Sequence, residues 1–364
     1  MLVLFDFFEL TPGKGKSIGI NNYAINLLEA LADRPDNICT FIVACNSSFD
    51  KTRMQNLQSK GVLFHTVKYN PSILARIFWN RLGAALLSRK MKINLYFSPK
   101  GFLPHGLSFL CKQASSLVVI HDLIPFWYKD RFPKYFGLME ELFILGGLEY
   151  SVKYSDSIVA ISDFTAADIA RRLGRKSGIE TVYNGVPLTA ADKNLYEGDY
   201  IFSVGSSLPH KNLETLLSAY SIYRSVTANP LPLVICGVSD PGVEGVLAVK
   251  GISDFQLHSY YAHAKLFIFL PHIEGFGFPP LEALSHHTPV LCSDIPVLRE
   301  ITKGLCTYVK PDCADSVALM IGSLLSDHNL EQDSIKISAL LSEYSWRNCA
   351  EKISNIMQKM GGVK

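Results

Sequence analysis

Short runs of bulky apolar residues recur along this chain, and segments in which apolar and polar positions follow helical spacing separate several of them. Apolar runs without alternation are typical of strands buried on both faces, as in a parallel sheet. The clearest run is Leu-Phe-Ile-Phe-Leu at 266–270. Strands that alternate with helices predict parallel sheets with right-handed crossovers, in which ligands bind at the carboxyl ends of the strands. The other runs predicted as strands are 2–8, 39–44, 62–67, 94–97, 117–120, 157–161, 180–182, 200–205, 231–236 and 246–250.

The length of 364 residues predicts two domains, each large enough to bury its own core. We expect residues 1–188 to form the first domain and residues 199–340 the second, followed by a terminal helix over 341–364. The segment from 187 to 198 is polar and aperiodic, as expected of a linker.

Composition excludes several classes of protein. No apolar stretch reaches the roughly 18 residues that a membrane span requires. Residues 1–8 carry no basic segment and no cleavage site, so we expect a core strand there and not a signal peptide. The eight cysteines are scattered and form no Cys-x-x-Cys pair, which predicts buried free thiols in a reducing compartment and neither disulfides nor zinc.

The net charge of +2 is unevenly distributed. Residues 51–121 contain eleven Lys or Arg and no acid, which leaves 24 basic and 33 acidic residues elsewhere. Within this segment, residues 73–91 are predicted as a helix with Arg and Lys among its apolar positions. We expect its apolar stripe to pack on the first domain. The alternative is that the helix lies in a membrane surface, with its cations on anionic lipid or on a lipid-diphosphate acceptor. The apolar positions are Ile73, Leu74, Ile77, Phe78, Leu82 and Leu86.

The stretch after the 266–270 strand predicts an anion site. It reads Pro-His-Ile-Glu-Gly-Phe-Gly-Phe-Pro-Pro-Leu-Glu, with two glycines, then two prolines that suit the first turn of a helix beginning near Leu281. Backbone N–H groups and a helix N-terminus together favour a diphosphate. Glu274 and Glu282 flank this position and would accept hydrogen bonds from neutral hydroxyls, such as those of a sugar or ribose. The alternative is an ordinary strand–loop–helix whose glutamate complements the helix dipole.

Two further strand ends carry candidate residues. Lys211 follows the strand at 200–205 and precedes a helix, where it would bind an anion or simply be solvated. His121 follows the strand at 117–120 and would face the ligand side of the sheet or serve a structural role. Gly-Lys-Ser at 15–17 is not a P-loop, because the glycine required five positions before Gly15 is Leu10.

Glu-Gly-Phe-Gly-x-Pro-x-x-Glu, with seven residues between Glu274 and Glu282, resembles the signature of the family-four retaining glycosyltransferases. This resemblance implies an α/β fold of the GT-B architecture, with two Rossmann-like domains whose parallel sheets face each other across a cleft. It implies that Glu282 binds the ribose of a nucleotide and Glu274 the donor sugar. The backbone amides of Gly275, Phe276, Gly277 and Phe278 would contact the diphosphate and the transferred sugar, although the family usually has Leu or Val at the position of Phe278.

Other segments carry the same resemblance. Gly19 matches a glycine that lies against the donor phosphate, while Asn22 replaces the usual Arg. His121, in His-Asp-Leu-Ile-Pro, matches a histidine that positions the transferred sugar. Lys211 matches the lysine that pairs with the diphosphate, and Ser206 and His210 stand where a second Arg is common. The resemblance also implies that residues 1–188 are the acceptor-side domain, that 199–340 bind the nucleotide-sugar, and that the terminal helix crosses back to the first domain.

The function implied is a metal-independent retaining hexosyltransferase that needs no cofactor and binds no nucleic acid. Its catalytic residues would be His121, Glu274 and Lys211. The donor would be GDP-mannose, with UDP- and dTDP-sugars as open alternatives. The acceptor would be a glycan or lipid-linked glycan of bacterial envelope polysaccharide or lipopolysaccharide. We therefore expect a cytoplasmic enzyme in peripheral contact with the inner face of an anionic membrane.

Three other functions compete with this one. A glycoside hydrolase would act without a nucleotide through two carboxylates about 5 to 10 Å apart. A nucleotide-sugar epimerase of the same architecture would consume donor without acceptor. A non-catalytic GT-B module would bind glycans or partner proteins and turn nothing over.

Overall fold

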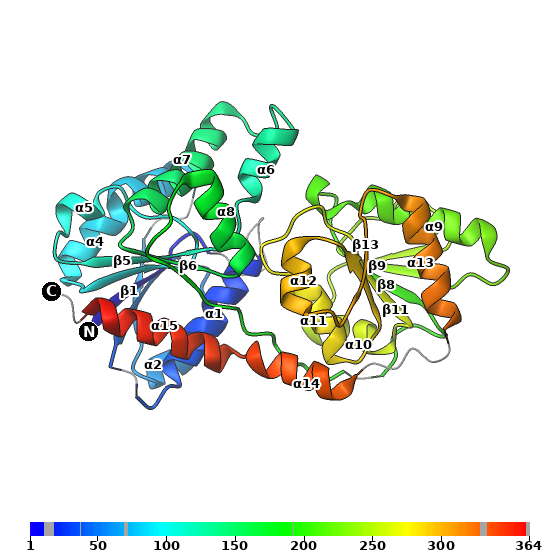
Figure 1. Cartoon of the computed structure of the whole chain (residues 1–364). Coiled ribbons are helices and arrows are strands. Elements are labelled where there is room, and N and C mark those ends of the chain that lie inside the picture. Colours follow the sequence, from blue (N-terminus) through cyan, green and yellow to red (C-terminus); the bar gives the residue numbers. More distant parts are fainter. Residues whose placement is uncertain (11–17, 37, 69–71, 192, 328–332, 362–364) are drawn as a thin grey trace. The chain divides into compact units, whose positions relative to one another are not determined.

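The computed structural model describes residues 1–10, 18–36, 38–68, 72–191, 193–327 and 333–361 (Figure 1). The chain divides into two units. Unit 1 comprises Met1–Gly185 together with Trp346–Lys364, and unit 2 comprises Val186–Ser345. The segment from 187 to 198 therefore belongs to unit 2. The eight cysteines all lie in the described part of the chain and are free thiols. No helix among the described residues is long and apolar enough to cross a bilayer.

Unit 1 is built on a seven-stranded sheet in the order β3-β2-β1-β4-β5-β6-β7, and each of these pairings is parallel. The strands are β1 (Leu2–Phe7), β2 (Thr40–Cys45), β3 (Leu63–Thr66), β4 (Leu95–Ser98), β5 (Ser115–Ile120), β6 (Ser157–Ala160) and β7 (Ile179–Thr181). The helices are α1 (Ile18–Ala32), α2 (Lys51–Ser59), α3 (Ile73–Phe78), α4 (Ala84–Met91), α5 (Leu107–Leu110), α6 (Ile124–Arg131), α7 (Leu138–Tyr154), α8 (Asp163–Leu173) and α15 (Trp346–Gly361).

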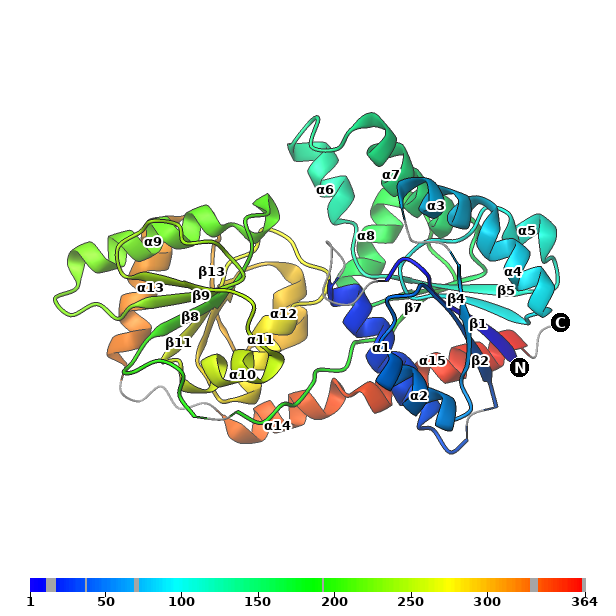
Figure 2. The same ribbon diagram turned by 180° about the vertical axis from the view of Figure 1, so that it is seen from behind.

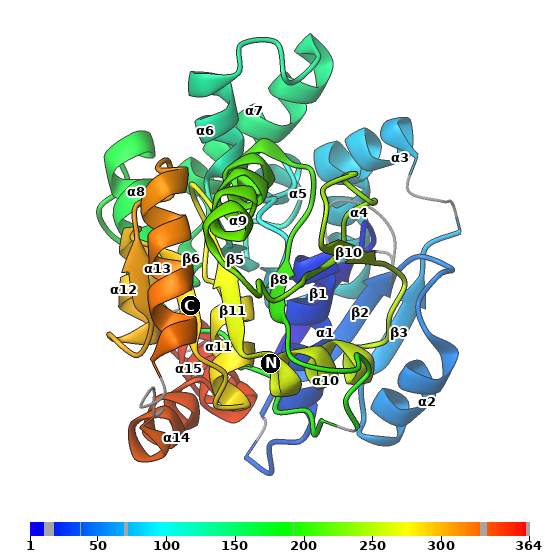
Figure 3. The ribbon, with the colours of Figure 1, turned by 90° about the vertical axis from the view of Figure 1, so that its right-hand side faces the viewer.

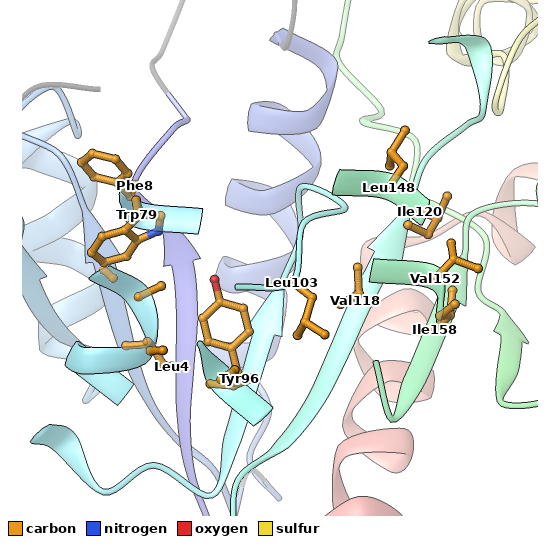
Figure 4. Packing of buried hydrophobic residues seen from close by; sticks show 14 of the residues in the cluster. Leu4, Phe8, Trp79, Tyr96, Leu103, Val118, Ile120, Leu148, Val152 and Ile158 are labelled. Carbon is orange, nitrogen blue, oxygen red and sulfur yellow. The ribbon is translucent and has the colours of Figure 1, made fainter. Parts of the chain in front are cut away.

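The core of unit 1 combines residues from both ends of its sequence. Figure 4 shows part of it, with Phe8 against Trp79 at one end and Val152 beside Ile158 at the other. The rings of Phe8 and Trp79 lie 4.7 Å apart. The last helix, α15, packs against α1 on unit 1 (Figure 2).

Unit 2 contains a six-stranded sheet in the order β10-β9-β8-β11-β12-β13, again with parallel pairings. Helices α9 and α13 pack side by side and contribute to one apolar core with the sheet (Figure 3). The strands are β8 (Ile201–Val204), β9 (Leu233–Cys236), β10 (Val246–Val249), β11 (Leu266–Phe269), β12 (Val290–Ser293) and β13 (Thr307–Val309). The helices are α9 (Leu213–Val226), α10 (Asp254–His263), α11 (Phe278–Ser285), α12 (Pro296–Thr302), α13 (Ala314–Ser326) and α14 (Ser334–Glu343), with a 3₁₀ turn, η2, at Pro209–Lys211.

The predicted fold class is confirmed: each unit is a Rossmann-like α/β domain with a parallel sheet. Both sheets reverse their strand order beside the first strand of the unit, which is where ligands of such sheets bind. In unit 1 this point lies between β1 and β4, and in unit 2 between β8 and β11.

Helix α1 begins at Ile18, and the Gly-Lys-Ser segment at 15–17 lies outside the described residues. Residues 73–91 are helical, but a π-helical segment, η1 (Trp79–Gly83), interrupts them. The prediction that their apolar stripe packs on unit 1 is wrong for four of its six positions, which are exposed. Leu74 is 79% exposed and Phe78 46% exposed, because the opposite face of the helix is buried.

Candidate functional site

In unit 2, two neighbouring strands deliver the candidate residues to one edge of the sheet. β8 and β11 pair in parallel register, so the loops at their carboxyl ends lie side by side. The loop after β8 carries Lys211 at the end of the short η2 turn. The loop after β11 carries Glu274. The backbone N–H of His272 donates to the carbonyl of His210 at 2.9 Å and fastens the two loops together.

Lys211 and Glu274 form an ion pair in this edge. Their side chains are 25% and 13% exposed, so the pair is partly buried yet open to solvent on one side. The Lys211 ammonium also lies 5.6 Å from the centre of the Phe269 ring. Asn212, with a left-handed φ of 55°, turns the chain from η2 into α9 directly after the lysine. The pair therefore presents one cation and one hydrogen-bond acceptor at the carboxyl ends of β8 and β11.

The bend from β11 into α11 requires glycine at Gly277. Its φ of 107° is strained for any other residue, and an added Cβ would lie 2.5 Å from Cδ2 of Leu298. The helix begins at Phe278, three residues earlier than predicted, and the two prolines lie in its first turn. Pro279 and Pro280 have no N–H, so these two residues offer no amide to an anion. Phe276 is 2% exposed and packs on Tyr344, so only its backbone can serve a ligand.

Glu282 lies in the second turn of α11 and is held by α10. Tyr261, which is fully buried, donates its hydroxyl to Oε2 of Glu282 at 2.9 Å. Burial raises the pKa of the Glu282 carboxyl to about 7, although the Tyr261 hydrogen bond acts in the opposite direction. His258 and His286 join the same two helices through a ring-nitrogen contact of 2.8 Å. Glu282 is thus a carboxyl group whose charge changes near neutral pH.

Sequence reasoning missed His272, Asp312 and Tyr261. Nδ1 of His272 lies 3.1 Å from Oδ1 of Asp312, and Nδ2 of Asn212 donates to the carbonyl of Pro311 at 2.8 Å. These contacts tie the loop after β13 to the loops after β8 and β11. Asp312 has no motif around it, and only the strand order β8-β11-β12-β13 brings it close. Tyr261 looks like a core residue in the sequence, and its contact with Glu282 depends on how α10 packs on α11.

The remaining donor-side candidates are not members of the ion pair. Ser206 caps its own loop, with Oγ accepting weakly from the N–H of Leu208 at 3.5 Å. His210 is 7% exposed, and burial, followed by the neighbouring Lys211 charge, lowers its pKa to about 4. It is therefore neutral at physiological pH. The Phe278 ring lies tilted against the Phe276 ring, with ring centres 5.0 Å apart.

Unit 1 holds His121 and Gly19. Nε2–H of His121 donates to the carbonyl of Pro99 at 2.7 Å, and burial lowers the pKa of the ring to about 4. The ring is therefore neutral, its proton lies on Nε2, and Nδ1 carries a lone pair that accepts no hydrogen bond from the described residues. The Tyr23 ring abuts it at 4.8 Å and 89°. Gly19 lies in the first turn of α1, where an added Cβ would meet nothing within 4 Å.

The structure thus brings Lys211, His210, Glu274 and the glycine bend together in unit 2. Asp122, next to His121, accepts from the N–H of Ile124 at 2.9 Å and caps the next turn. Ser162 is the N-cap of α8, and its Oγ accepts from the N–H of Thr165 at 3.1 Å. No cluster of three or more metal-ligating side chains occurs among the residues described.

Comparison with known proteins defines the class of this site. The family model described as "Glycosyltransferase Family 4" matches residues 18–190, and the model described as "Glycosyl transferases group 1" matches residues 190–339. The two matches together span nearly the whole chain and meet close to the division between the two units. The chain belongs to the family-four glycosyltransferases, as the glycine-rich signature indicated.

Similarity to particular proteins is weaker but covers the full length. The chain is 26% identical to the O-antigen chain mannosyltransferase RfbU of Salmonella typhimurium, over 94% of this chain and 96% of that protein. It is 26% identical to O-antigen chain mannosyltransferase B of Escherichia coli, over 96% of this chain and 98% of that protein.

Among solved structures, sucrose-phosphate synthase from Thermosynechococcus elongatus superposes with a TM-score of 0.75 at 15% identity, over 100% of both chains. Anabaena Alr3699/HepE, in complex with UDP and glucose, superposes with a TM-score of 0.71 at 14% identity, over 99% of this chain and 100% of that one. At these identities the superpositions show that the fold is shared.

Proposed function

We propose that this glycosyltransferase is a retaining mannosyltransferase that moves mannose from GDP-mannose to a glycan or lipid-linked glycan acceptor in bacterial envelope polysaccharide assembly. The observation that carries the proposal is the Lys211–Glu274 ion pair beside the glycine bend, at the carboxyl ends of β8 and β11. The two O-antigen mannosyltransferases that the chain resembles over almost their full length support the choice of sugar and pathway.

The ion pair suits a donor that carries both a diphosphate and a sugar. When a diphosphate binds, the Lys211 ammonium leaves the Glu274 carboxylate and pairs with phosphate oxygens. These oxygens are the stronger partners for an ammonium group at this partly desolvated edge of the sheet. Glu274, released from the lysine, then accepts hydrogen bonds from the hydroxyls of the sugar. The amides of 275–278 and the start of α11 add further donors to the phosphate. Charge on the leaving diphosphate is thereby stabilised by protein groups, so we expect turnover without a metal ion.

Glu282 and His121 complete the proposed roles. Glu282 accepts hydrogen bonds from the ribose hydroxyls. His121, neutral and with its lone pair on Nδ1, accepts a hydrogen bond from a hydroxyl of the transferred sugar and positions it, without donating or removing a proton. In the front-face mechanism expected for this family, the leaving phosphate takes the proton of the acceptor hydroxyl. No enzyme nucleophile is then needed.

The proposed setting is the cytoplasmic face of the membrane, where a lipid-linked acceptor would be available. The acid-free segment 51–121 supports this placement. A non-catalytic module and an epimerase remain the alternatives. The mannosyltransferases that the chain resembles support transfer over these two alternatives.

Transfer assays test the assignment. Purified protein is incubated with labelled GDP-mannose, UDP-glucose or dTDP-rhamnose, with and without a membrane extract containing lipid-linked oligosaccharide. We expect label in the lipid fraction from GDP-mannose only, in EDTA as well as in magnesium, with the anomeric configuration of the donor retained. Melting temperatures with GDP, UDP and dTDP identify the base independently, because a ligand that binds the folded state raises them.

Three outcomes would contradict the proposal. Donor consumed without acceptor indicates an epimerase, and cleavage of a glycan without nucleotide indicates a hydrolase. Donor bound without turnover on any acceptor indicates a binding module. Within the proposal, Lys211→Ala and Glu282→Ala should weaken nucleotide binding by roughly tenfold or more, whereas Glu274→Ala should lower kcat more than affinity.

A further inference from the structure

An exposed apolar stripe runs along the helical segment from α3 to α4 in unit 1. Ile73 and Leu74 are 73% and 79% exposed, and Phe78 and Leu86 are 46% and 44% exposed. Leu74, Phe78, Leu82 and Leu86 recur at intervals of four, which keeps them close to one line along a helix. A soluble surface helix normally directs such a line at its own core.

The reason for the outward orientation lies in buried polar bonds on the other face. Nε1 of Trp79 donates to both carboxylate oxygens of Asp6 at 3.1 Å, and Nδ2 of Asn80 donates to Glu9. Nε of Arg76 donates to Glu9 at 2.5 Å. Asp6 is completely buried and Glu9 nearly so, and Lys100 pairs with both carboxylates. Breaking the bonds from the helix would still remove hydrogen bonds from two buried charges, which is costly. The bonds fix the roll of the helix about its axis, and exposure of the apolar stripe is built into the fold.

The first turns of α7 extend this apolar surface. The guanidinium of Arg76 lies 5.4 Å from the centre of the Phe143 ring, which places the start of α7 beside α3. Figures 2 and 3 show both helices on the same side of the unit 1 sheet. Leu138, Met139 and Leu142 are 74%, 71% and 63% exposed. The α3–α7 apolar surface is hereafter the set Ile73, Leu74, Phe78, Leu86, Leu138, Met139 and Leu142.

Cations on α4 and η1 flank this surface. Arg81, Arg89 and Lys90 are exposed, and none of the three forms an ion pair with any described residue. The chain offers no acid between 51 and 121 to neutralise them. Exposed leucine and phenylalanine on one side of a helix, with arginine and lysine beside them, is the pattern of helices that lie in the interface of an anionic bilayer.

We propose that the α3–α7 apolar surface inserts into the headgroup region of an anionic phospholipid bilayer, with Arg81, Arg89 and Lys90 on the lipid phosphates. The seven large apolar side chains of this surface lie on neighbouring helical segments, and this grouping differs from the scattered exposure expected of a protein in water. A second copy of the chain fits less well, because a twofold contact would bring the same three cations of each copy together. This inference rests on the proposed function, to which it adds the surface that binds the membrane. Bilayer binding is measured without donor or acceptor, so its test is independent of turnover.

Vesicle sedimentation tests the surface. The full chain is mixed with sucrose-loaded vesicles containing one third phosphatidylglycerol, or phosphatidylcholine alone, at low and at high salt. We expect binding to the anionic vesicles at low salt, weaker binding at high salt, and little binding to phosphatidylcholine. Each cation near such a surface raises the partition coefficient roughly fivefold, which corresponds to about 1 kcal/mol. Replacing all three cations in the variant Arg81→Glu/Arg89→Glu/Lys90→Glu should therefore lower vesicle binding by at least about a hundredfold. Leu74→Ser/Phe78→Ser should lower it roughly tenfold.

Matched controls come from unit 2. Leu319 and Ile335 are 76% and 83% exposed, so Leu319→Ser/Ile335→Ser removes equally exposed apolar side chains from other helices and should leave binding unchanged. Circular dichroism and melting temperature check that each variant is folded. Wild-type protein that stays in the supernatant at low salt overturns the proposal, and so does an equal loss of binding in the control. A dimer in light scattering that Leu74→Ser/Phe78→Ser dissociates, without any vesicle binding, would assign the surface to a second copy.

Discussion

The pH dependence of donor binding follows from the position of Glu282. Burial raises the pKa of its carboxyl to about 7, so the group is largely neutral below that pH and largely ionised above it. Ribose hydroxyls donate hydrogen bonds, and a carboxylate accepts them far better than a carboxylic acid does. The direction is therefore fixed: donor affinity should rise as the pH increases through about 7. If only the ionised form binds, the ionised fraction changes by about tenfold between about pH 6 and about pH 8, and Kd should change by the same factor.

The assay is titration calorimetry with GDP-mannose, whose diphosphate is esterified at both ends and does not itself titrate in this range. His210 and His286 do not interfere, because burial lowers the pKa of each to about 4. Glu282→Gln should bind more weakly at the higher pH and show a flat pH profile. A wild-type affinity that rises toward acid, or a Glu282→Gln profile as steep as that of the wild type, would refute the assignment of ribose binding to a titrating Glu282.

Three further predictions concern the bend, a strained residue and the support of His121. Gly277→Ala should destabilise unit 2 by about 2 kcal/mol or more, because alanine would have to adopt a strained φ and its Cβ would lie 2.5 Å from Leu298. The variant should also lose donor binding. Denaturant unfolding measures the first effect and calorimetry the second. His287→Gly should raise the free energy of unfolding by up to about 1 kcal/mol, because His287 has a left-handed φ of 59°, and an unchanged denaturation midpoint would contradict this. Tyr23→Leu should lower kcat and leave nucleotide affinity unchanged, because it removes the ring contact with His121. In a His121→Ala background the same substitution should lower kcat no further. Additive losses of kcat would show that Tyr23 acts by another route.

The residues of the proposed donor site could be placed at one sheet edge from the sequence because they follow buried strands at short, fixed distances. Lys211 comes seven residues after β8 ends and Glu274 five residues after β11 ends. Parallel strands place such loops at one edge of the sheet, whatever else the chain does. The ion pair between the two residues was not predicted, because each had been assigned to a different part of the ligand. The contact of Asp312 with His272 joins loops two strands apart and has no local signal.

The apolar stripe of α3 and α4 shows the opposite case. Its periodicity correctly predicted a helix and wrongly predicted which face is buried. A hydrophobic pattern records that one side of a helix differs from the other, and it does not record what lies against each side. In this helix Trp79 and Asn80 bond to Asp6 and Glu9, residues more than seventy positions earlier in the chain, and those buried bonds decide the outcome.

The sequence by itself therefore determined the two parallel sheets, the strand ends at which ligands bind and the glycine bend, because local backbone chemistry and strand burial are written within short segments. Only the tertiary structure decided the neutral state of His121 and the lone pair on its Nδ1, the raised pKa of Glu282 and the outward face of the α3–α4 helix. Each of these properties depends on desolvation and on partners from distant parts of the chain. Such burial and such contacts form only when the chain folds, so no short segment of the sequence contains them.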